Sequence, residues 1–252
     1  MTGKRTVRRQ RPAELRHRLE GRRFERVDRR GKYLALVLDD GQVLVIHLRM
    51  SGQLLWVPPN ESVPTKPHTH VVMDLDDGSE LRFVDPRTFG EWYVTDEVRA
   101  DGLPAEFDRF GPDPIADGLT AKVLRERLRG RRTAVKVALT DQRVIAGIGN
   151  LYADEICFSA RVRPDRRCES LGDHEIGSLS RAVSAVLRSA IKARGSSLKD
   201  ARYRDLTGEL GAYQARHRVY DRAGEPCGRC GSRIEKIRIG ARVAYCCTGC
   251  QH

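Results

Sequence analysis

The 252-residue sequence lacks any uninterrupted apolar run of the roughly 18 residues that a membrane-spanning helix needs. No apolar segment follows its basic N-terminus, Met-Thr-Gly-Lys-Arg, so no secretory leader is predicted. It also lacks internal repeats and low-complexity tracts. With 40% hydrophobic and 32% charged residues, the chain is typical of a globular protein long enough for two domains. We expect a cytoplasmic protein with no membrane partner.

Cysteine is scarce outside the last 26 residues. Only Cys157 and Cys168 precede this tail, and neither lies in a nucleophile motif, so we expect one buried small residue and one incidental thiol. The tail holds two Cys-x-x-Cys pairs separated by sixteen residues, a spacing typical of a tetrahedral four-cysteine zinc site in a reducing compartment. The predicted ligands of one structural zinc ion are Cys227, Cys230, Cys247 and Cys250.

The segment between the two cysteine pairs reads as a β-hairpin. Residues 232–245 alternate apolar and polar positions around a turn at Gly240-Ala241, and so short a segment needs the metal to fold. The hairpin is basic, which suggests contact with phosphate. Cys247 is preferred to Cys246 as the third ligand because it restores the two-residue spacing to Cys250.

Positive charge is in excess, with 46 Lys and Arg against 34 Asp and Glu and a net charge of +12. Residues 1–32 hold thirteen of the basic residues and only four acidic ones. A second basic run covers residues 122–136, and the tail hairpin is a third. Any one block could be an ordinary solvated surface. Three separated blocks favour a nucleic-acid partner, since each neutralised phosphate releases counterions.

The first half of the chain has the alternation and turn signals of β-structure. A short helix is predicted at residues 12–20 because Pro12 stands at its start and Gly21 after its end. Two Asp-Asp-Gly turns join β-branched runs, as in hairpins. The predicted strands are residues 33–38, 42–48, 53–57, 70–75, 80–84 and 91–94. They favour a β-sandwich or a flattened barrel.

From Gly111 onward the hydrophobic pattern changes to a helical period. The predicted helices are residues 119–128, 133–139, 151–158 and 174–192. A polar stretch, residues 199–213, leads to the tail. The sequence therefore predicts an α+β multidomain protein, with domains at residues 1–110, 111–213 and 214–252.

The segment 146–155 reads Ala-Gly-Ile-Gly-Asn-Leu-Tyr-Ala-Asp-Glu and separates two predicted helices. Its glycines allow a sharp turn that exposes backbone N–H groups at a helix start, where phosphate is attracted. Such a turn can grip a DNA backbone without reading its sequence. An ordinary turn between helices is the alternative.

Three further motifs lie in the β-rich half. They are Gly31-Lys32-Tyr33, His47-Leu-Arg-Met50-Ser51-Gly52 and Asp85-Pro86-Arg87-Thr88-Phe89-Gly90. Taken singly, Met50 and Phe89 read as packing residues and His47 as a strand histidine. The motifs become distinctive only in combination and in this order.

Together with the Gly-x-Gly segment and the four-cysteine tail, these motifs closely resemble those of formamidopyrimidine-DNA glycosylases, the family shared with endonuclease VIII. The resemblance runs from about residue 12 to the C-terminus. It implies an N-terminally shortened β-sandwich domain, a helix-two-turn-helix domain and a zinc-finger hairpin, with DNA bound across the cleft between them. The implied activity is that of a DNA glycosylase and AP lyase of base excision repair acting on oxidised purines.

The resemblance also assigns roles to individual side chains. The residues that correspond to phosphate contacts are Lys32, His47, Asn150 and Arg242, of which Lys32 and Arg242 support catalysis. The residues that correspond to the trio filling the gap left by an extruded nucleotide are Met50, Arg87 and Phe89. Such wedges offset part of the few kcal/mol that base flipping costs. Residues 199–213 take the place of the loop that closes over the flipped base.

The sequence departs from the family at its start, where members read Met-Pro-Glu and the proline amine attacks the sugar C1′. Pro12 cannot substitute because its nitrogen is an amide, and Glu14 lies in a predicted helix. A processed Thr2 would offer a primary amine. Either the true start lies upstream, or this is a non-catalytic damaged-DNA-binding homologue that lost its nucleophile. We favour the first, because a missing helix would destabilise the domain core.

The expected partner is double-stranded DNA with a damaged base or an abasic site, bound by a monomer associated with the nucleoid. An RNA-binding zinc-ribbon protein is a weaker alternative, because it leaves Met50, Arg87 and Phe89 unexplained.

Overall fold

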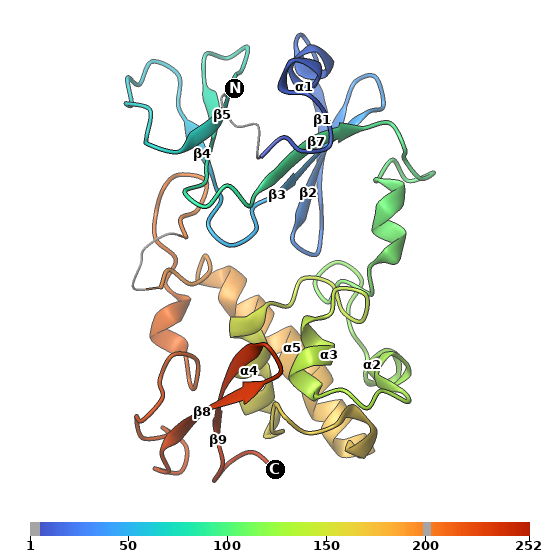
Figure 1. Cartoon of the computed structure of the whole chain (residues 1–252), viewed down its shortest axis with the longest axis vertical. Coiled ribbons are helices and arrows are strands. Elements are labelled where there is room, and N and C mark those ends of the chain that lie inside the picture. Colours follow the sequence, from blue (N-terminus) through green and yellow to red (C-terminus); the bar gives the residue numbers. More distant parts are fainter. Residues whose placement is uncertain (1–5, 199–202) are drawn as a thin grey trace. The chain divides into compact units, whose positions relative to one another are not determined.

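The computed structural model describes residues 6–198 and 203–252, which form two compact units (Figure 1). Unit 1 contains the chain up to Asp108 and the segment Arg194–Gln214. Unit 2 contains Arg109–Ala193 and Ala215–His252. Each unit is therefore built from two stretches that are distant in sequence. Among the described residues, no helix has the length and apolar character needed to cross a membrane.

Unit 1 is a β-sandwich. Its first sheet has the order β1-β2-β3-β7 and its second the order β4-β6-β5, with neighbouring strands antiparallel. Its elements are α1 (Pro12–Leu19), β1 (Phe24–Arg30), β2 (Tyr33–Leu38), β3 (Val43–His47), β4 (Gln53–Val57), β5 (Thr69–Asp74), β6 (Glu80–Val84), β7 (Glu91–Thr95) and η1 (Ala105–Arg109, whose last residue belongs to unit 2). The predicted sandwich is confirmed.

The core of the sandwich contains the fully buried rings of Phe83 and Trp92, whose centroids are 5.6 Å apart. Strand β3 is buried along its whole length and lies between β2 and β7 in the sheet. Residues 203–214 pack with this unit, and the amide of Trp56 on β4 donates to the carbonyl of Leu206 at 2.8 Å. Residues 199–202, the start of the predicted closing loop, lie outside the described residues.

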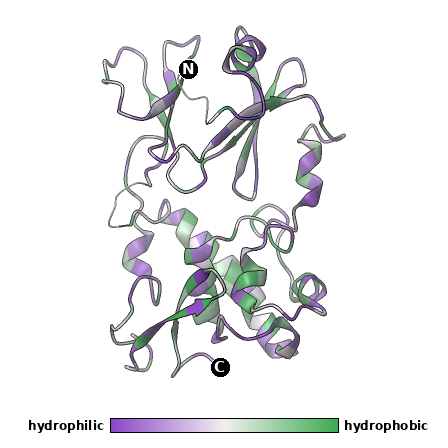
Figure 2. Cartoon of the chain, in the orientation of Figure 1, coloured by the Kyte–Doolittle hydropathy of each residue, from purple (hydrophilic) through white to green (hydrophobic). Residues whose placement is uncertain are grey.

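Unit 2 combines helices with a hairpin. Its elements are α2 (Ala121–Leu128), α3 (Val135–Thr140), α4 (Asn150–Ala160), η2 (Cys168–Ser170), α5 (Asp173–Lys192), η3 (Tyr213–Arg216, which begins in unit 1), β8 (Ile234–Ile239) and β9 (Arg242–Cys247). Helices α3 and α4 are largely buried, and α3 is mostly green in Figure 2. The predicted helical region and tail hairpin are confirmed.

Strand β1 was not predicted from the sequence. Its sequence, Phe-Glu-Arg-Val-Asp-Arg-Arg, has only two apolar residues, and Val27 is 63% exposed. It lies at the edge of its sheet and is held by backbone pairing to β2, so hydrophobic alternation is not required of it.

Candidate functional site

Two adjacent loops of unit 1 present Met50, Arg87 and Phe89 together. Met50 follows β3 and is 72% exposed, while Phe89 precedes β7 and is 49% exposed. The guanidinium Nη1 of Arg87 lies 3.9 Å from the sulfur of Met50. Met50 has the highest exposure among the large apolar side chains of the described residues, and it lies beside an arginine rather than alone. The structure therefore brings together Met50 and Arg87, which are 37 positions apart in the sequence, and Phe89 follows Arg87 on the same loop.

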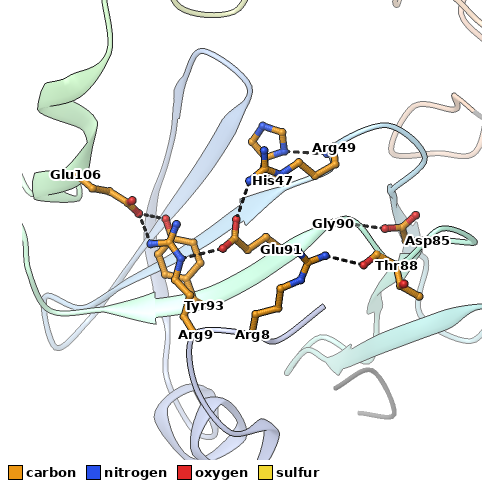
Figure 3. A network of polar contacts seen from close by, with 10 residues as sticks. All are labelled: Arg8, Arg9, His47, Arg49, Asp85, Thr88, Gly90, Glu91, Tyr93 and Glu106. Carbon is orange, nitrogen blue, oxygen red and sulfur yellow. Dashed lines mark hydrogen bonds and ion pairs between the residues drawn. The ribbon is translucent and has the colours of Figure 1, made fainter. Parts of the chain in front are cut away.

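The carboxylate of Asp85 ties the two loops together. It is fully buried and accepts hydrogen bonds from Ser51 Oγ at 2.6 Å, from the Gly90 amide at 2.7 Å and from the Arg87 amide at 3.2 Å. Figure 3 shows the bond between Asp85 and Gly90. A buried carboxylate with three donors is well satisfied, so it can fix the geometry of both loops.

Strained backbone positions flank the trio. Arg49, immediately before Met50, has φ of 55°, and Thr88, between Arg87 and Phe89, has φ of 57°. A non-glycine residue in this region costs of order 1 kcal/mol and persists only where the surroundings impose it. Gly90 is required for a different reason: a Cβ there would overlap the ring of Phe83.

His47 ends β3 near the same loops and is only 7% exposed. Its Nδ1 accepts a hydrogen bond from the Arg49 amide at 2.8 Å (Figure 3), and its ring packs edge-on against Tyr33 with centroids 4.3 Å apart. Burial, assisted by the positive charges of Arg49 and Lys32, lowers the pKa of His47 to about 4. The ring is therefore neutral at pH 7, and because Nδ1 accepts, Nε2 carries the proton.

Lys32 is exposed in the turn between β1 and β2. Its positive charge, like that of Arg49, lowers the pKa of His47, whereas the negative charge of Glu91 raises it. One end of the first sheet thus carries a cation and a neutral N–H donor, a combination suited to phosphate oxygen.

In unit 2, Arg242 begins β9, and its guanidinium donates to the hydroxyl of Thr140 on α3. The neighbouring Lys136 and Asp154 form an ion pair of 2.7 Å with both side chains fully buried. Lys136 Nζ also donates to the Val243 carbonyl at 2.5 Å, and Asp154 accepts from the Tyr245 amide at 3.1 Å.

The Lys136–Asp154 pair thus fixes β9 against α3 and α4. Burial lowers the pKa of Lys136 and raises that of Asp154 to about 7, while each partner's charge opposes the effect of burial on the other. The pair is ionised, because the two charges lie 2.7 Å apart and each side chain also has one backbone bond.

Asn150 is the first residue of α4 and is exposed. The turn before it is held by Gln142, whose side-chain nitrogen donates to the carbonyls of Thr140 and Ile148 at 3.0 Å and whose oxygen accepts from the Gly147 amide at 2.9 Å. A helix start is a position at which backbone amides attract anions, and the exposed Asn150 side chain lies at this one.

The cysteines Cys227, Cys230, Cys247 and Cys250 present four sulfur atoms that all lie within 4.8 Å of one another. The Cys227 and Cys250 sulfurs are 3.8 Å apart, and those of Cys230 and Cys247 are 3.5 Å apart. Tetrahedral Zn²⁺ with bonds of about 2.3 Å requires sulfurs about 3.8 Å apart, so these residues fit the metal.

The zinc finger holds one structural zinc ion, and Cys247 rather than Cys246 lies in the four-cysteine cluster. Successive strand residues point to opposite faces, which directs Cys246 away from the metal-binding sulfurs. Its thiol is buried, which raises its pKa to about 11. Cys157 and Cys168 are also buried.

Several positioning residues were not predicted from the sequence. The sequence identifies Lys136 only as the last residue of the basic run 122–136, and it indicates no structural role for Asp85 or Asp154. Glu155 is also buried and accepts from the amides of Arg218, Val219 and Tyr220 at 2.9–3.0 Å, so it anchors the segment before the finger. A charged residue inside an otherwise apolar helical stretch, as in Ala-Asp-Glu-Ile, is the signal that could have identified Asp154 and Glu155.

Three family models match consecutive parts of the chain. They are the formamidopyrimidine-DNA glycosylase N-terminal domain at residues 1–92, the formamidopyrimidine-DNA glycosylase H2TH domain at residues 110–202, and the zinc finger found in FPG and IleRS at residues 224–252.

Similar proteins and solved structures point to the same family as these models. The formamidopyrimidine-DNA glycosylase of Herpetosiphon aurantiacus is 44% identical over 91% of this chain and 82% of its own length. That of Chloroflexus aggregans is 45% identical over 95% of this chain and 85% of its own length. Among solved structures, the Lactococcus lactis Fpg in complex with DNA containing an abasic site has a TM-score of 0.86 at 32% identity, over 98% of this chain and 89% of that one. The Thermus thermophilus MutM (Fpg) structure has a TM-score of 0.81 at 37% identity, over 92% of this chain and 84% of that one.

Proposed function

This chain belongs to the formamidopyrimidine-DNA glycosylase family, and we propose that it excises oxidised purines from duplex DNA after flipping the damaged nucleotide out of the helix. It is a DNA glycosylase of base excision repair, and its partner is duplex DNA with a damaged base or an abasic site. The observation that carries this proposal is the exposed trio Met50, Arg87 and Phe89, held on two loops by one buried carboxylate.

The trio suits the energetic problem of base flipping. Extruding a nucleotide costs a few kcal/mol of stacking and pairing. Met50 and Phe89 offer apolar surfaces that can replace lost stacking, and Arg87 offers donors to the base left without a partner. Because these side chains are exposed in the free protein, inserting them into DNA also removes apolar surface from water.

Phosphate contacts hold the duplex while the nucleotide is out. Two come from the end of the first sheet in unit 1, where Lys32 supplies a charge and His47 a neutral Nε2–H. Two more come from unit 2, where Asn150 lies at a helix start and Arg242 on the metal-stabilised hairpin. We assign Lys32 and Arg242 a supporting role in catalysis, because their charges stabilise the phosphates beside the reacting sugar.

The zinc ion has a structural role only. Four thiolates would fill all four positions of a tetrahedral zinc ion, so no position would be open for water or substrate. When bound, the zinc ion holds the base of the hairpin that carries Arg242. We propose that the Arg242 guanidinium binds a DNA phosphate. The three-part division at residues 1–110, 111–213 and 214–252 remains part of this proposal. So do a monomeric state and association with the nucleoid in the cytoplasm.

We extend the proposal to AP lyase activity, in which a protein amine attacks the sugar C1′, forms a Schiff base and allows elimination of the phosphates. Among residues 6–198 and 203–252 we assign none to the attacking amine. The test is incubation with a duplex that contains one abasic site, followed by borohydride. A covalent adduct is expected, and mass spectrometry of its peptides would identify the amine.

An undamaged duplex of the same sequence is the control and should give no adduct. Tight binding to the abasic-site duplex without an adduct would contradict the lyase proposal. That outcome would instead support a protein that binds damaged DNA without catalysis.

A further inference from the structure

The N-terminal segment of unit 1, residues 6–10, lies along β7, the edge strand of the first sheet. The Trp92 amide donates to the carbonyl of Thr6 at 3.1 Å, and the Val94 amide donates to the side chain of Gln10 at 2.7 Å. Thr6 and Val7 are buried. The segment therefore covers the strand edge and holds the two intervening arginines, Arg8 and Arg9, at defined places.

Arg8 contacts the loop that carries Phe89. Its Nη2 donates to the carbonyl of Thr88 at 2.8 Å (Figure 3). Thr88 is the left-handed residue between Arg87 and Phe89, with φ of 57°. A donor on its carbonyl restrains the peptide plane that sets the direction of the Phe89 side chain.

Arg9 acts on the other loop through Glu91. Its Nε donates to Glu91 at 2.9 Å and its Nη1 to Glu106 at 2.7 Å, while its guanidinium lies 3.7 Å from the centroid of the Tyr93 ring. The second oxygen of Glu91 accepts from Arg49 Nη2 at 3.1 Å. Figure 3 shows this chain of contacts from one side of the sheet to the loops.

The Glu91 carboxylate is thereby shared by two arginines. Glu91 is 8% exposed, and although burial raises its pKa, the bonds from Arg9 and Arg49 hold that pKa below its usual value. It stays ionised at neutral pH and fixes Arg49, the left-handed residue with φ of 55° immediately before Met50. The N-terminal segment therefore contacts both strained residues next to the trio: Thr88 directly through Arg8, and Arg49 through Arg9 and Glu91.

We infer that residues 6–10 are a positioning segment for damage recognition, in which Arg8 and Arg9 fix the strained residues Thr88 and Arg49 and so direct Phe89 and Met50 into the DNA. This inference rests on the proposed function of the trio. Arg8 and Arg9 touch no reacting atom; they act through the two loops.

The test uses the full chain and a duplex in which 2-aminopurine stands opposite a stable abasic-site analogue. Insertion of the trio changes the stacking of 2-aminopurine and hence its fluorescence. The variants are Arg8→Ala and Arg9→Lys, since a lysine keeps the charge of Arg9 but cannot bond Glu91 and Glu106 in the same planar geometry. Arg16→Ala is the matched control, because Arg16 is an exposed arginine of α1 that pairs only weakly with Glu20 at 3.4 Å.

We expect Arg8→Ala and Arg9→Lys to lower the preference for the abasic-site duplex over an undamaged one roughly fivefold and to reduce the fluorescence change. Arg16→Ala should keep both values, and melting temperatures should show that all variants are folded. Wild-type fluorescence and preference in both variants, or equal losses in Arg16→Ala, would overturn the inference. If the wild-type protein itself showed no preference for the abasic-site duplex, the proposed function would fail instead.

Discussion

The two units hold their proposed DNA-contact side chains in opposite ways. In unit 1, Met50 and Phe89 are exposed, and the loops that carry them are held by hydrogen bonds to the buried Asp85. Each loop also contains a residue with left-handed backbone, Arg49 or Thr88. In unit 2, the strand that begins with Arg242 is fixed by a fully buried ion pair and by a metal centre.

This contrast follows from what each side chain has to do. An apolar wedge must remain exposed until DNA arrives, so it cannot be anchored by its own burial. A charged side chain can extend from a strand that is itself buried, because its guanidinium stays hydrated while the backbone beneath it is fixed. Variants that remove an anchor should therefore affect the two units very differently.

The largest effect is expected from loss of zinc. Chelation, or Cys227→Ser, should unfold the hairpin, because metal binding contributes about 10 kcal/mol to the folding of isolated zinc fingers. Amide hydrogen exchange should show loss of protection in β8 and β9 but not in the β-sandwich. The matched control is Cys246→Ser, which leaves four thiolates and should retain one zinc ion per chain. Protected β8 and β9 amides after complete zinc removal would refute this account of the finger.

The next largest effect is expected from Lys136→Met, which leaves Asp154 as an unpaired buried charge. Breaking a buried pair by removing one partner costs about 3–5 kcal/mol. Urea denaturation should therefore show a large loss of stability in unit 2.

The double variant Lys136→Met with Asp154→Leu is the informative comparison. Because no buried charge remains, it should recover most of the lost stability. Losses that simply add in the double variant would show that the pair is not coupled.

Removing a hydrogen bond that holds the loops of unit 1, as in Ser51→Ala, should lower stability by only about 1 kcal/mol, which sharpens the contrast between the units.

An effect smaller than that of Lys136→Met is expected from a change of pH, through His47. The pKa of His47 falls from 6.5 to about 4 on folding, so between these values the unfolded chain binds the proton and the folded protein does not. The stability associated with the neutral ring is complete above pH 6.5 and is lost as the pH falls through 4, by up to about 3 kcal/mol. Denaturation midpoints measured from pH 7 to pH 4 would show this slope.

His47→Gln is the control for that measurement. Glutamine does not titrate, so the variant should show a flatter dependence of stability on pH across the same range. An unchanged slope would assign the acid sensitivity to other groups.

Much of the fold could be predicted from the sequence because its signals are local. Asp-Asp-Gly turns, the helical period after Gly111 and the cysteine spacing each depend on neighbouring residues. β1 was missed because an edge strand needs backbone pairing rather than an apolar pattern. The identities of the trio and of Arg242 came from motif resemblance, and nothing in their local sequence predicted their exposure.

The anchors could not be predicted, because they join residues that are distant in sequence. Asp85 meets Ser51 across 34 positions, and Lys136 meets Val243 across 107. The contact between Arg9 and Glu91 spans 82 positions. Single charged residues in a sequence do not reveal whether a partner will be present in the folded chain, and only the structure supplies it.

The most direct test of the contrast is the salt dependence of binding to an abasic-site duplex. Arg242→Ala should lower the slope of log affinity against log salt concentration by about 0.9, since one phosphate contact is lost. Met50→Ala should keep the wild-type slope but reduce the preference for the abasic-site duplex roughly tenfold, because insertion releases no counterion. A wild-type slope in Arg242→Ala, or a reduced slope in Met50→Ala, would contradict the division between a phosphate-binding hairpin and an inserted trio.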